Sequence, residues 1–329
     1  TRMRAILTDA EKRLHWSEVP DPAVGAEDVL IRVEAAAVNR ADLMQREGDY
    51  PPPPGCPEWM GLEVSGTVAA MGRTAAEKSR WRPGDRVCAL LGGGGYAEWV
   101  SVRYDMLMPV PAGCTMEEAA AMPEAFATSY LNLFYEGQMR PGETLLMMAG
   151  ASGLASVTIP MAKAFGIRVI TTVRSEARRQ AIAHLGADRV VNLSEESLGG
   201  VLREELDAGH PVDAAIDCVG GAEMGACLPF LSRGGRWIMI AALGGTRTEI
   251  DLKTVYVRNL RIIGSTLRSR APEVKARLLS DLVREVWPKV EQGLIRPTIY
   301  RVLPVTSCEE AHELLYRREN VGKVVLKVR

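Results

Sequence analysis

A turn of small residues lies near the middle of the chain, between an apolar run and a helix-length segment. The run LLMMAG leads into residues 149–153, where Ala149, Gly150, Ser152 and Gly153 have little or no side chain. Small residues let backbone N–H groups and the start of the next helix approach a pyrophosphate. The match to G-x-G-x-x-G alone is weak, because glycine-rich turns are common. Its place between strand and helix predicts a dinucleotide-binding turn, with Gly150, Ser152 and Gly153 as contacts.

A basic cluster follows at the end of the next apolar run, in the sequence TTVRSEARR. Arg174 and Ser175 end this predicted strand, and Arg178 follows one helical turn later. An acidic residue at this position, roughly 20 residues after the turn, binds the ribose of NAD. Guanidinium groups instead pair with phosphate. We therefore predict that Arg174, Ser175 and Arg178 bind a 2′-phosphate, which favours NADPH over NADH. The alternative is that they are solvated charges at the start of a helix.

The elements that must position these residues change character along the chain. Up to about residue 123, short apolar runs alternate with turn clusters such as VPDPAVGAED, which predicts a mostly β, partly closed domain. Residues 124–265 alternate apolar strands with helix-length segments, and this order predicts a doubly wound parallel sheet. Residues 266–329 contain a charged helix and a last strand that return to the first domain. We thus predict one domain from 1–123 with 266–329 and a second from 124–265.

The composition and net charge of the chain make some classes of binding partner unlikely. The 329 residues suit two domains, and no apolar run reaches the roughly 18 residues of a membrane span. The formal net charge of −1 offers no overall attraction to nucleic acid. Six widely spaced cysteines contain no C-x2-C pair, which indicates reduced thiols. We expect a cytoplasmic protein without a secretory signal that acts on a small molecule, with no membrane partner and with nucleic acid an unlikely one.

A family resemblance covers nearly the whole chain. It rests on the segments NRADLMQREGDYPPPPG, GLEVSGTVAAMG, GDRVCALLGGGGYAEWV, AAAMPEAFATSY, DCVGG, GRWIMIAALGG, STLRSRAPEVK and GKVVLKV, in this order and with compatible spacing. Together they resemble the zinc-free quinone oxidoreductases of the medium-chain dehydrogenase/reductase superfamily, and most of all the p53-inducible quinone oxidoreductase type. The resemblance implies an α/β fold with a GroES-like, mostly β catalytic domain and a Rossmann domain that binds NADPH.

The resemblance also implies hydride transfer without a metal. Zinc-dependent relatives have Cys at the position of Asn39 and a His-Glu pair at Leu62 and Glu63. Without a Lewis acid, the enzyme needs an acceptor that is already reactive, and quinones or related conjugated carbonyls are such acceptors. By resemblance Asn39 and Tyr50 line the substrate side, where Asn39 positions a reactant and Tyr50 donates a hydrogen bond or proton. The alternatives are a turn residue for Asn39 and a packing residue for Tyr50.

Further cofactor contacts and the assembly follow from the same resemblance. The expected contacts are Thr128, Asn192, Cys218, Gly220, Ala242, Leu243 and Arg268. The resemblance also implies a homodimer formed through the edge strand at LRIIGST, which agrees with the need to cover an apolar edge.

Besides Arg174, which replaces a glycine of the family, three residues depart from the family pattern on the cofactor side: Ala155, Pro160 and Leu193. Ala155 replaces a glycine that packs a helix on a strand, and Pro160 costs a helix interior about 3 kcal/mol unless it kinks. Leu193 replaces a tyrosine, so the three changes threaten cofactor affinity more than cofactor identity. Two other functions stay open: a 2-alkenal or enoyl reductase, and a weakly active nucleotide-binding protein with a sensor, structural or RNA-binding role.

Overall fold

The computed structural model describes residues 1–329, which divide into two compact units. Unit 1 contains residues 1–127, 268–293 and 297–329, and unit 2 contains residues 128–267 and 294–296. The chain first passes from one unit to the other inside helix α4 (Pro123–Tyr130). None of the helices combines the length and the apolar character that a bilayer crossing requires.

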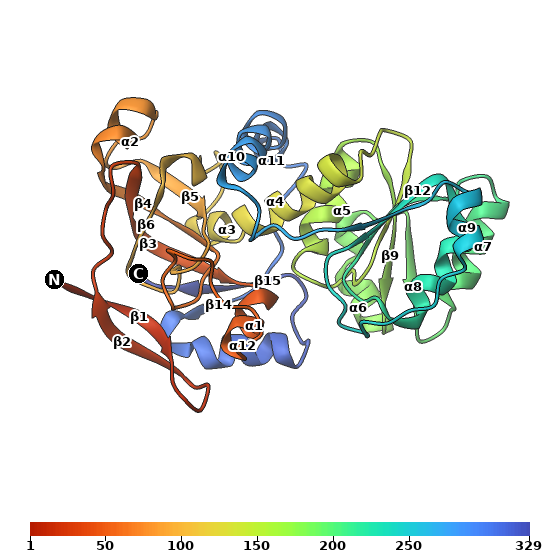
Figure 1. Cartoon of the computed structure of the whole chain (residues 1–329), viewed down its shortest axis with the longest axis horizontal. Coiled ribbons are helices and arrows are strands. Elements are labelled where there is room, and N and C mark those ends of the chain that lie inside the picture. Colours follow the sequence, from red (N-terminus) through yellow and green to blue (C-terminus); the bar gives the residue numbers. More distant parts are fainter. The chain divides into compact units, whose positions relative to one another are not determined.

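Unit 1 is built on a seven-stranded sheet of order β14-β15-β3-β4-β5-β7, with β6 paired to β3. The strands are β3 (Asp28–Val38), β4 (Glu63–Met71), β5 (Arg86–Leu90), β6 (Trp99–Arg103), β7 (Leu107–Pro109), β14 (Ile299–Pro304) and β15 (Lys323–Lys327). A separate hairpin joins β1 (Arg2–Thr8) to β2 (Leu14–Pro20). β15 runs antiparallel to β3, so a strand from the end of the chain completes a sheet begun near its start (Figure 1).

Strand β3 explains how this sheet forms its core. Its first half alternates, with Val29, Ile31 and Val33 buried on one face. The Ala-Ala-Ala-Val end is buried throughout because neighbouring elements cover both faces there. The helices of the unit are α1 (Arg40–Arg46), α2 (Arg73–Lys78), α3 (Met116–Ala120), α10 (Pro272–Asp281), α11 (Trp287–Glu291) and α12 (Cys308–Tyr316).

Unit 2 is a doubly wound parallel sheet, as predicted. Its six strands have the order β10-β9-β8-β11-β12-β13, which is the 3-2-1-4-5-6 order of a Rossmann fold. They are β8 (Thr144–Met147), β9 (Arg168–Val173), β10 (Arg189–Asn192), β11 (Val212–Asp217), β12 (Leu231–Met239) and β13 (Arg261–Gly264). Since the strand order reverses between β8 and β11, ligands of such sheets bind at the carboxyl ends of these strands.

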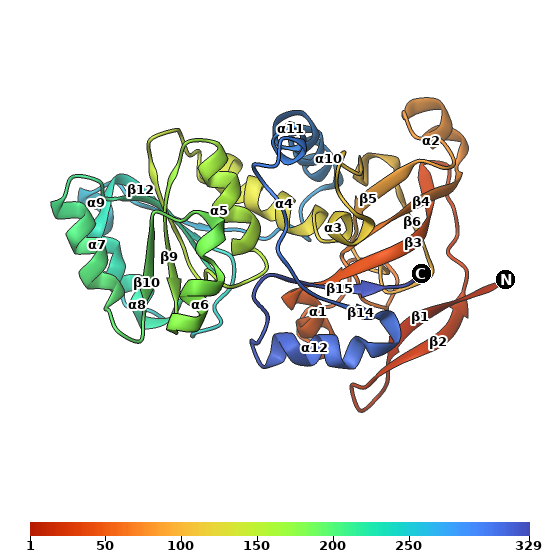
Figure 2. The ribbon, with the colours of Figure 1, turned by 180° about the vertical axis from the view of Figure 1, so that it is seen from behind.

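Helices cover both faces of this second sheet (Figures 1 and 2). α5 (Ala155–Ala164) and α6 (Glu176–Ala181) lie on one face, and α7 (Leu198–Asp207), α8 (Gly221–Cys227) and α9 (Leu252–Val257) lie on the other. Helix α5 continues through Pro160 and ends at Ala164. Side-chain hydroxyls support its first turns, since Ser156 donates to the Gly153 carbonyl at 2.6 Å and Thr158 to the Leu154 carbonyl at 3.0 Å.

Candidate functional site

Ten of the predicted cofactor residues lie at the carboxyl edge of the sheet in unit 2, where strands β8 to β12 end. They are Gly150, Ser152 and Gly153 after β8, Arg174 and Ser175 after β9, Asn192 at the end of β10, Cys218 and Gly220 after β11, and Ala242 and Leu243 after β12. Parallel strands bring their carboxyl ends to one edge, so residues far apart in sequence share it. Thr128 also belongs to unit 2, where its carbonyl accepts from the Asn132 side chain at 2.9 Å.

The turn after β8 is fixed by its own backbone. Ala149 has φ +55°, a left-handed conformation that is uncommon for a residue with a side chain. The Gly150 amide donates to the Thr172 carbonyl at 2.8 Å. A Cβ at Gly150 would lie 2.6 Å from the Thr171 hydroxyl oxygen, so this position must be glycine for the turn to pack on β9.

The start of α5 has backbone donors available for an anion. The Ser152 hydroxyl accepts from the Ala155 amide at 3.1 Å and so satisfies one of the first donors of the helix. The amides of Gly153 and Leu154 make no hydrogen bond within the protein, and both residues are partly exposed. Amides at a helix start that are available in this way suit a phosphate group. The turn therefore fits the pyrophosphate of a dinucleotide.

The end of β9 presents a cation beside this turn. Arg174 is exposed and has no ion-pair partner in the structure. Ser175 begins α6, and its hydroxyl accepts from the Arg178 amide at 3.2 Å. Arg179, one residue further, is paired with Glu176 at 3.2 Å. Arg174 is therefore the cation of this group that remains free to pair with a ligand phosphate.

The end of β10 contains a buried donor without a partner. The Asn192 side chain accepts through Oδ1 from the amide and the hydroxyl of Ser194, at 3.1 and 2.7 Å. Its Nδ2 is buried and makes no hydrogen bond. This N–H group is therefore available to an acceptor atom of a ligand at the predicted cofactor edge. Leu193, which replaces a tyrosine of the family, packs against the hydrophobic core of unit 2.

The loops after β11 and β12 support each other. Asp217 accepts through Oδ1 from the amides of Val219 and Gly220, at 2.7 and 3.1 Å. The Leu243 amide donates to the Cys218 carbonyl at 2.9 Å, and the Gly244 amide donates to the Val219 carbonyl at 2.7 Å. The two loops thus form one backbone-bonded wall of the predicted cofactor edge.

In unit 1, Asn39 lies in a buried polar cluster at the end of β3. Its Nδ2 donates to Glu63 Oε2 at 2.9 Å, and its Oδ1 accepts from Lys323 Nζ at 2.9 Å. Lys323 also contacts Glu63 at 2.7 Å, with side chains that are 3% and 0% exposed. The second Glu63 oxygen accepts from the Glu124 amide at 2.8 Å. The family resemblance named Asn39 as a candidate site residue, but no sequence signal assigned Lys323 to this cluster.

A second buried network holds the Asn39 backbone. Asp42 Oδ2 accepts from the Asn39 amide at 2.9 Å and from the Tyr96 hydroxyl at 2.8 Å. The Tyr96 oxygen lies 3.2 Å from His312 Nε2. Burial raises the pKa of Asp42 to about 6, and burial followed by the Arg46 charge lowers the pKa of His312 to about 3. His312 is therefore neutral at pH 7, and the network fixes the start of helix α1.

Tyr50 is held by Arg268. The Arg268 guanidinium carbon lies 4.8 Å from the centre of the Tyr50 ring. The same group donates to the Gly92 carbonyl at 2.9 Å and to the Gln45 side chain at 2.7 Å, and Arg268 is buried. The Arg268 guanidinium is therefore hydrogen-bonded within unit 1, where it holds the Tyr50 ring in place. Its predicted contact with the cofactor stays a prediction.

Glu124 and Lys275 are ionisable side chains in the same unit that carry perturbed pKa values. Burial first, and then the nearby charge of Glu63, raise the pKa of the partly exposed Glu124 to about 8. Burial lowers the pKa of Lys275, which donates to the Arg268 carbonyl at 2.6 Å. Burial also raises the pKa of Tyr50, so its hydroxyl stays protonated at neutral pH. A carboxyl that keeps its proton at pH 7 is thus part of this unit.

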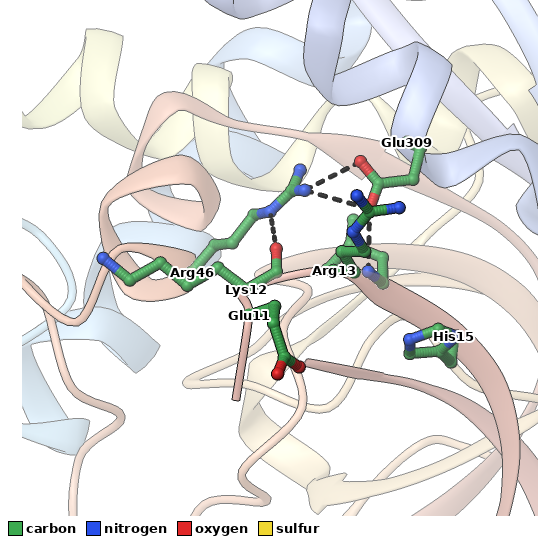
Figure 3. A pocket seen from close by; sticks show the side chains of 7 residues that line it. Glu11, Lys12, Arg13, His15, Arg46 and Glu309 are labelled. Carbon is green, nitrogen blue, oxygen red and sulfur yellow. Dashed lines mark hydrogen bonds and ion pairs between the residues drawn. The ribbon is translucent and has the colours of Figure 1, made fainter. Parts of the chain in front are cut away.

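A pocket on the surface of unit 1 contains none of the predicted site residues (Figure 3). It is lined by Glu11, Lys12, Arg13, Leu14, His15, Arg46 and Glu309. Arg46 donates to both carboxylate oxygens of Glu309, at 2.9 and 2.7 Å, and to the Lys12 carbonyl at 2.7 Å. The Leu14 amide donates to the same carboxylate at 2.7 Å. These hydrogen bonds connect the β1–β2 hairpin to helices α1 and α12. These polar groups of the pocket are thus bonded to one another within the protein.

Comparisons with known proteins agree with both folds. Residues 25–112 match the family model described as alcohol dehydrogenase GroES-like domain, and residues 153–284 match the one described as zinc-binding dehydrogenase. A solved structure described as an NAD-dependent alcohol dehydrogenase is 31% identical with a TM-score of 0.86, covering 99% of this chain and 100% of its own. The chain belongs to the medium-chain dehydrogenase/reductase superfamily. The predicted GroES-like and Rossmann folds are thereby confirmed.

Relatives of this medium-chain dehydrogenase/reductase include quinone oxidoreductases. Quinone oxidoreductase of Mus musculus is 28% identical over 313 residues, which are 94% of this chain and 92% of the relative. A mycobacterial protein solved in complex with NADPH is 28% identical with a TM-score of 0.86, covering 99% of this chain and 100% of its own. This medium-chain dehydrogenase/reductase is therefore an oxidoreductase.

Proposed function

We propose that the protein is an NADPH-dependent reductase that transfers hydride to quinones or related conjugated carbonyls without zinc. The observation that carries this proposal is the edge of the Rossmann sheet, where the free amides of Gly153 and Leu154 are followed at the next strand end by the unpaired Arg174. The mycobacterial relative solved with NADPH and the relatives named quinone oxidoreductase support the choice of cofactor and substrate.

The residues present fit a nicotinamide dinucleotide in their donor chemistry. The amides at the start of α5 would hold the pyrophosphate, Arg174 the 2′-phosphate, and the unpaired Asn192 Nδ2 an acceptor atom of the ligand. When bound, the cofactor supplies the hydride. Thr128, Cys218 and Ala242 complete the proposed contacts.

On the acceptor side, Asn39 and Tyr50 would act through hydrogen bonds. Asn39 keeps one N–H and one lone pair beyond its contacts with Glu63 and Lys323, so it can orient a carbonyl. Tyr50 remains protonated at neutral pH and can donate to a developing oxyanion. Neither Asn39 nor the buried Leu62 offers the thiolate or imidazole that zinc prefers, which supports a zinc-independent reaction.

Cofactor titration followed by steady-state assays tests this function. We expect NADPH to quench protein fluorescence saturably at micromolar concentrations, and we expect 1,2-naphthoquinone to be reduced with a higher kcat/KM than an enal. A preference for the enal would identify a 2-alkenal reductase. Saturable binding without turnover of either substrate would favour a nucleotide-binding protein, and no saturable binding at high micromolar NADPH would exclude both enzymes.

We further propose that the protein is a homodimer formed through β13, the edge strand of the Rossmann sheet. Ile262 in this strand is 42% exposed, and Leu252 and Tyr256 of α9 are 73% and 68% exposed. An unpaired apolar edge needs a cover, and a second copy of the same strand can extend the sheet. We expect sedimentation velocity to give twice the chain mass of 35.8 kDa.

The dimer proposal has a matched pair of variants. Ile262→Lys should shift the protein to the monomer, because it places a charge in the strand pairing. Leu294→Lys changes an apolar residue, 55% exposed, that is not part of this strand, and it should leave the mass unchanged. A monomeric wild-type protein, or a dimer that persists in Ile262→Lys, would exclude this interface.

A further inference from the structure

The Asn39 side-chain amide is hydrogen-bonded to two groups of opposite charge, one at its nitrogen and one at its oxygen. The carboxylate of Glu63 accepts from Asn39 Nδ2 at 2.9 Å, and the ammonium of Lys323 donates to Asn39 Oδ1 at 2.9 Å. The two charged groups also contact each other at 2.7 Å. Both side chains are almost completely buried, so water does not screen their effect on the amide.

The signs of these charges determine which way the amide points. The oxygen and nitrogen of an amide have nearly the same shape, so packing alone does not distinguish its two orientations. An ammonium group can only donate a hydrogen bond, and an ionised carboxylate can only accept one. A reversed Asn39 amide would place its NH2 group against Lys323 and its oxygen against Glu63. Both charge-assisted hydrogen bonds would then be lost, which leaves one orientation.

The sheet places the three residues together rigidly. Val38 of β3 pairs with Val324 of β15, and Ala36 of β3 pairs with Val64 of β4. Asn39, Lys323 and Glu63 are each the immediate neighbour in sequence of one paired residue, so adjacent strand ends bring them into contact. The bond from the Asn39 amide to Asp42 fixes the backbone as well. A turn of the Asn39 backbone would break the bond to Asp42, and a turn of its side chain would break the bonds to Glu63 and Lys323.

We propose that Lys323 is a positioning residue which, together with Glu63, sets the direction of the Asn39 amide and so determines which group of the acceptor Asn39 can bind. This inference rests on the proposed function, in which Asn39 lines the acceptor site. Lys323 itself does not need to touch the acceptor. It acts by leaving Asn39 with one N–H and one lone pair in a single fixed arrangement.

The variants must remove the orienting charges without leaving one of them buried alone, because an unpaired buried charge destabilises the fold. The double variant Lys323→Met with Glu63→Gln meets this condition. The glutamine oxygen can keep the hydrogen bond from the Glu124 amide, so its NH2 group faces Asn39 and no longer favours the wild-type direction of that amide. Lys323→Arg keeps the charge and the donor and should behave like the wild type. Lys327→Met is the matched control, because Lys327 lies in the same strand and forms an exposed ion pair with Glu117 at 3.3 Å.

The first readout is the Asn39 side-chain amide itself, observed by NMR of protein with 15N-labelled asparagine and assigned by its absence in Asn39→Ala. In the wild type, Lys323→Arg and Lys327→Met we expect one pair of Nδ2 proton signals with slow exchange. The double variant should show a shifted pair with faster exchange. An unchanged Asn39 signal in the double variant would overturn the proposal, whether or not the protein reduces quinones.

The second readout is a kinetic cycle with 1,2-naphthoquinone. The double variant should lower kcat by up to about 100-fold, the order of loss that follows when a positioning group is misplaced by about 1 Å, with little change in KM. In an Asn39→Ala background the same two substitutions should lower kcat no further, because Lys323 and Glu63 act through Asn39. Additive losses would show that the pair only stabilises the fold and would overturn the proposal. If the wild type reduces no quinone, the proposed function fails, and the NMR readout still decides this inference.

Discussion

Replacing Arg174 with Asp should weaken NADPH binding about 100-fold and leave NADH binding equal or improved. Arg174 is the exposed, unpaired cation at the end of β9. A hydrogen bond to a charged group contributes about 1.5–3 kcal/mol, and about 1.4 kcal/mol corresponds to a factor of ten in affinity. A carboxylate at this position would repel the 2′-phosphate and accept a hydrogen bond from the ribose hydroxyl of NADH.

Fluorescence titrations with both cofactors measure this change. Arg179→Ala is the matched control, because Arg179 lies in the adjacent helix and is already paired with Glu176. It should leave both dissociation constants within a factor of about two, as expected for loss of an exposed ion pair. If Arg174→Asp binds NADPH as tightly as the wild type, the 2′-phosphate is bound elsewhere and the proposed NADPH preference loses its basis.

Replacing Glu124 with Gln should make the unfolding free energy less dependent on pH. Burial raises the pKa of Glu124 from 4.5 to about 8 in the folded protein. Between these values the folded state keeps a proton that the unfolded state has released, so stability falls as the pH rises from about 5 to 8. One such group changes stability by at most about 1.4 kcal/mol per pH unit. Gln carries no titrating proton, so the variant should gain stability relative to the wild type as the pH rises.

Other buried groups titrate in the same range but remain in both proteins. Asp42, with its pKa raised to about 6, contributes in the same direction as Glu124, and His312, with its pKa lowered to about 3, contributes in the opposite direction. Denaturant unfolding at pH 5 to 9 of the wild type and Glu124→Gln isolates the Glu124 effect by subtraction. Glu273→Gln, which changes an exposed residue, should not alter the slope. Parallel curves for Glu124→Gln and the wild type would show that Glu124 ionises normally.

Local sequence signals were sufficient to predict the Rossmann sheet and the turn of small residues after its first strand. The strand before Ala149, the small residues of the turn and the helix after it lie within one short segment, and Arg174 follows at a distance set by one β-α-β unit. The start of helix α3 is also set by near neighbours in the chain, because Thr115 caps it by accepting from the Glu118 amide at 3.1 Å. Such features depend on neighbours in the chain, so a single sequence is enough to reveal them.

Pro160 and Arg268 show where local reasoning stopped short. The sequence predicted that Pro160 would cost helix α5 stability unless the helix kinked, and α5 continues through it with hydroxyl groups bonded back to its first carbonyls. The predicted contact of Arg268 with the cofactor stays a prediction, but the sequence did not indicate that its guanidinium contacts Tyr50, Gly92 and Gln45. Those partners are more than a hundred positions earlier in the chain, so no local pattern indicates them.

The sequence by itself determined the two folds, predicted a dinucleotide site at the edge of the Rossmann sheet and, through the family resemblance, named Asn39 and Tyr50 as candidate residues. Only the tertiary structure decided what orients them. Lys323 lies 284 positions from Asn39 and 260 from Glu63, and it appears in the sequence as the first residue of an apolar strand. Strand pairing brings these residues into contact, and burial strengthens the effect of their charges on the amide. Both depend on the folded sheet as a whole, which is why the sequence does not reveal the orienting pair.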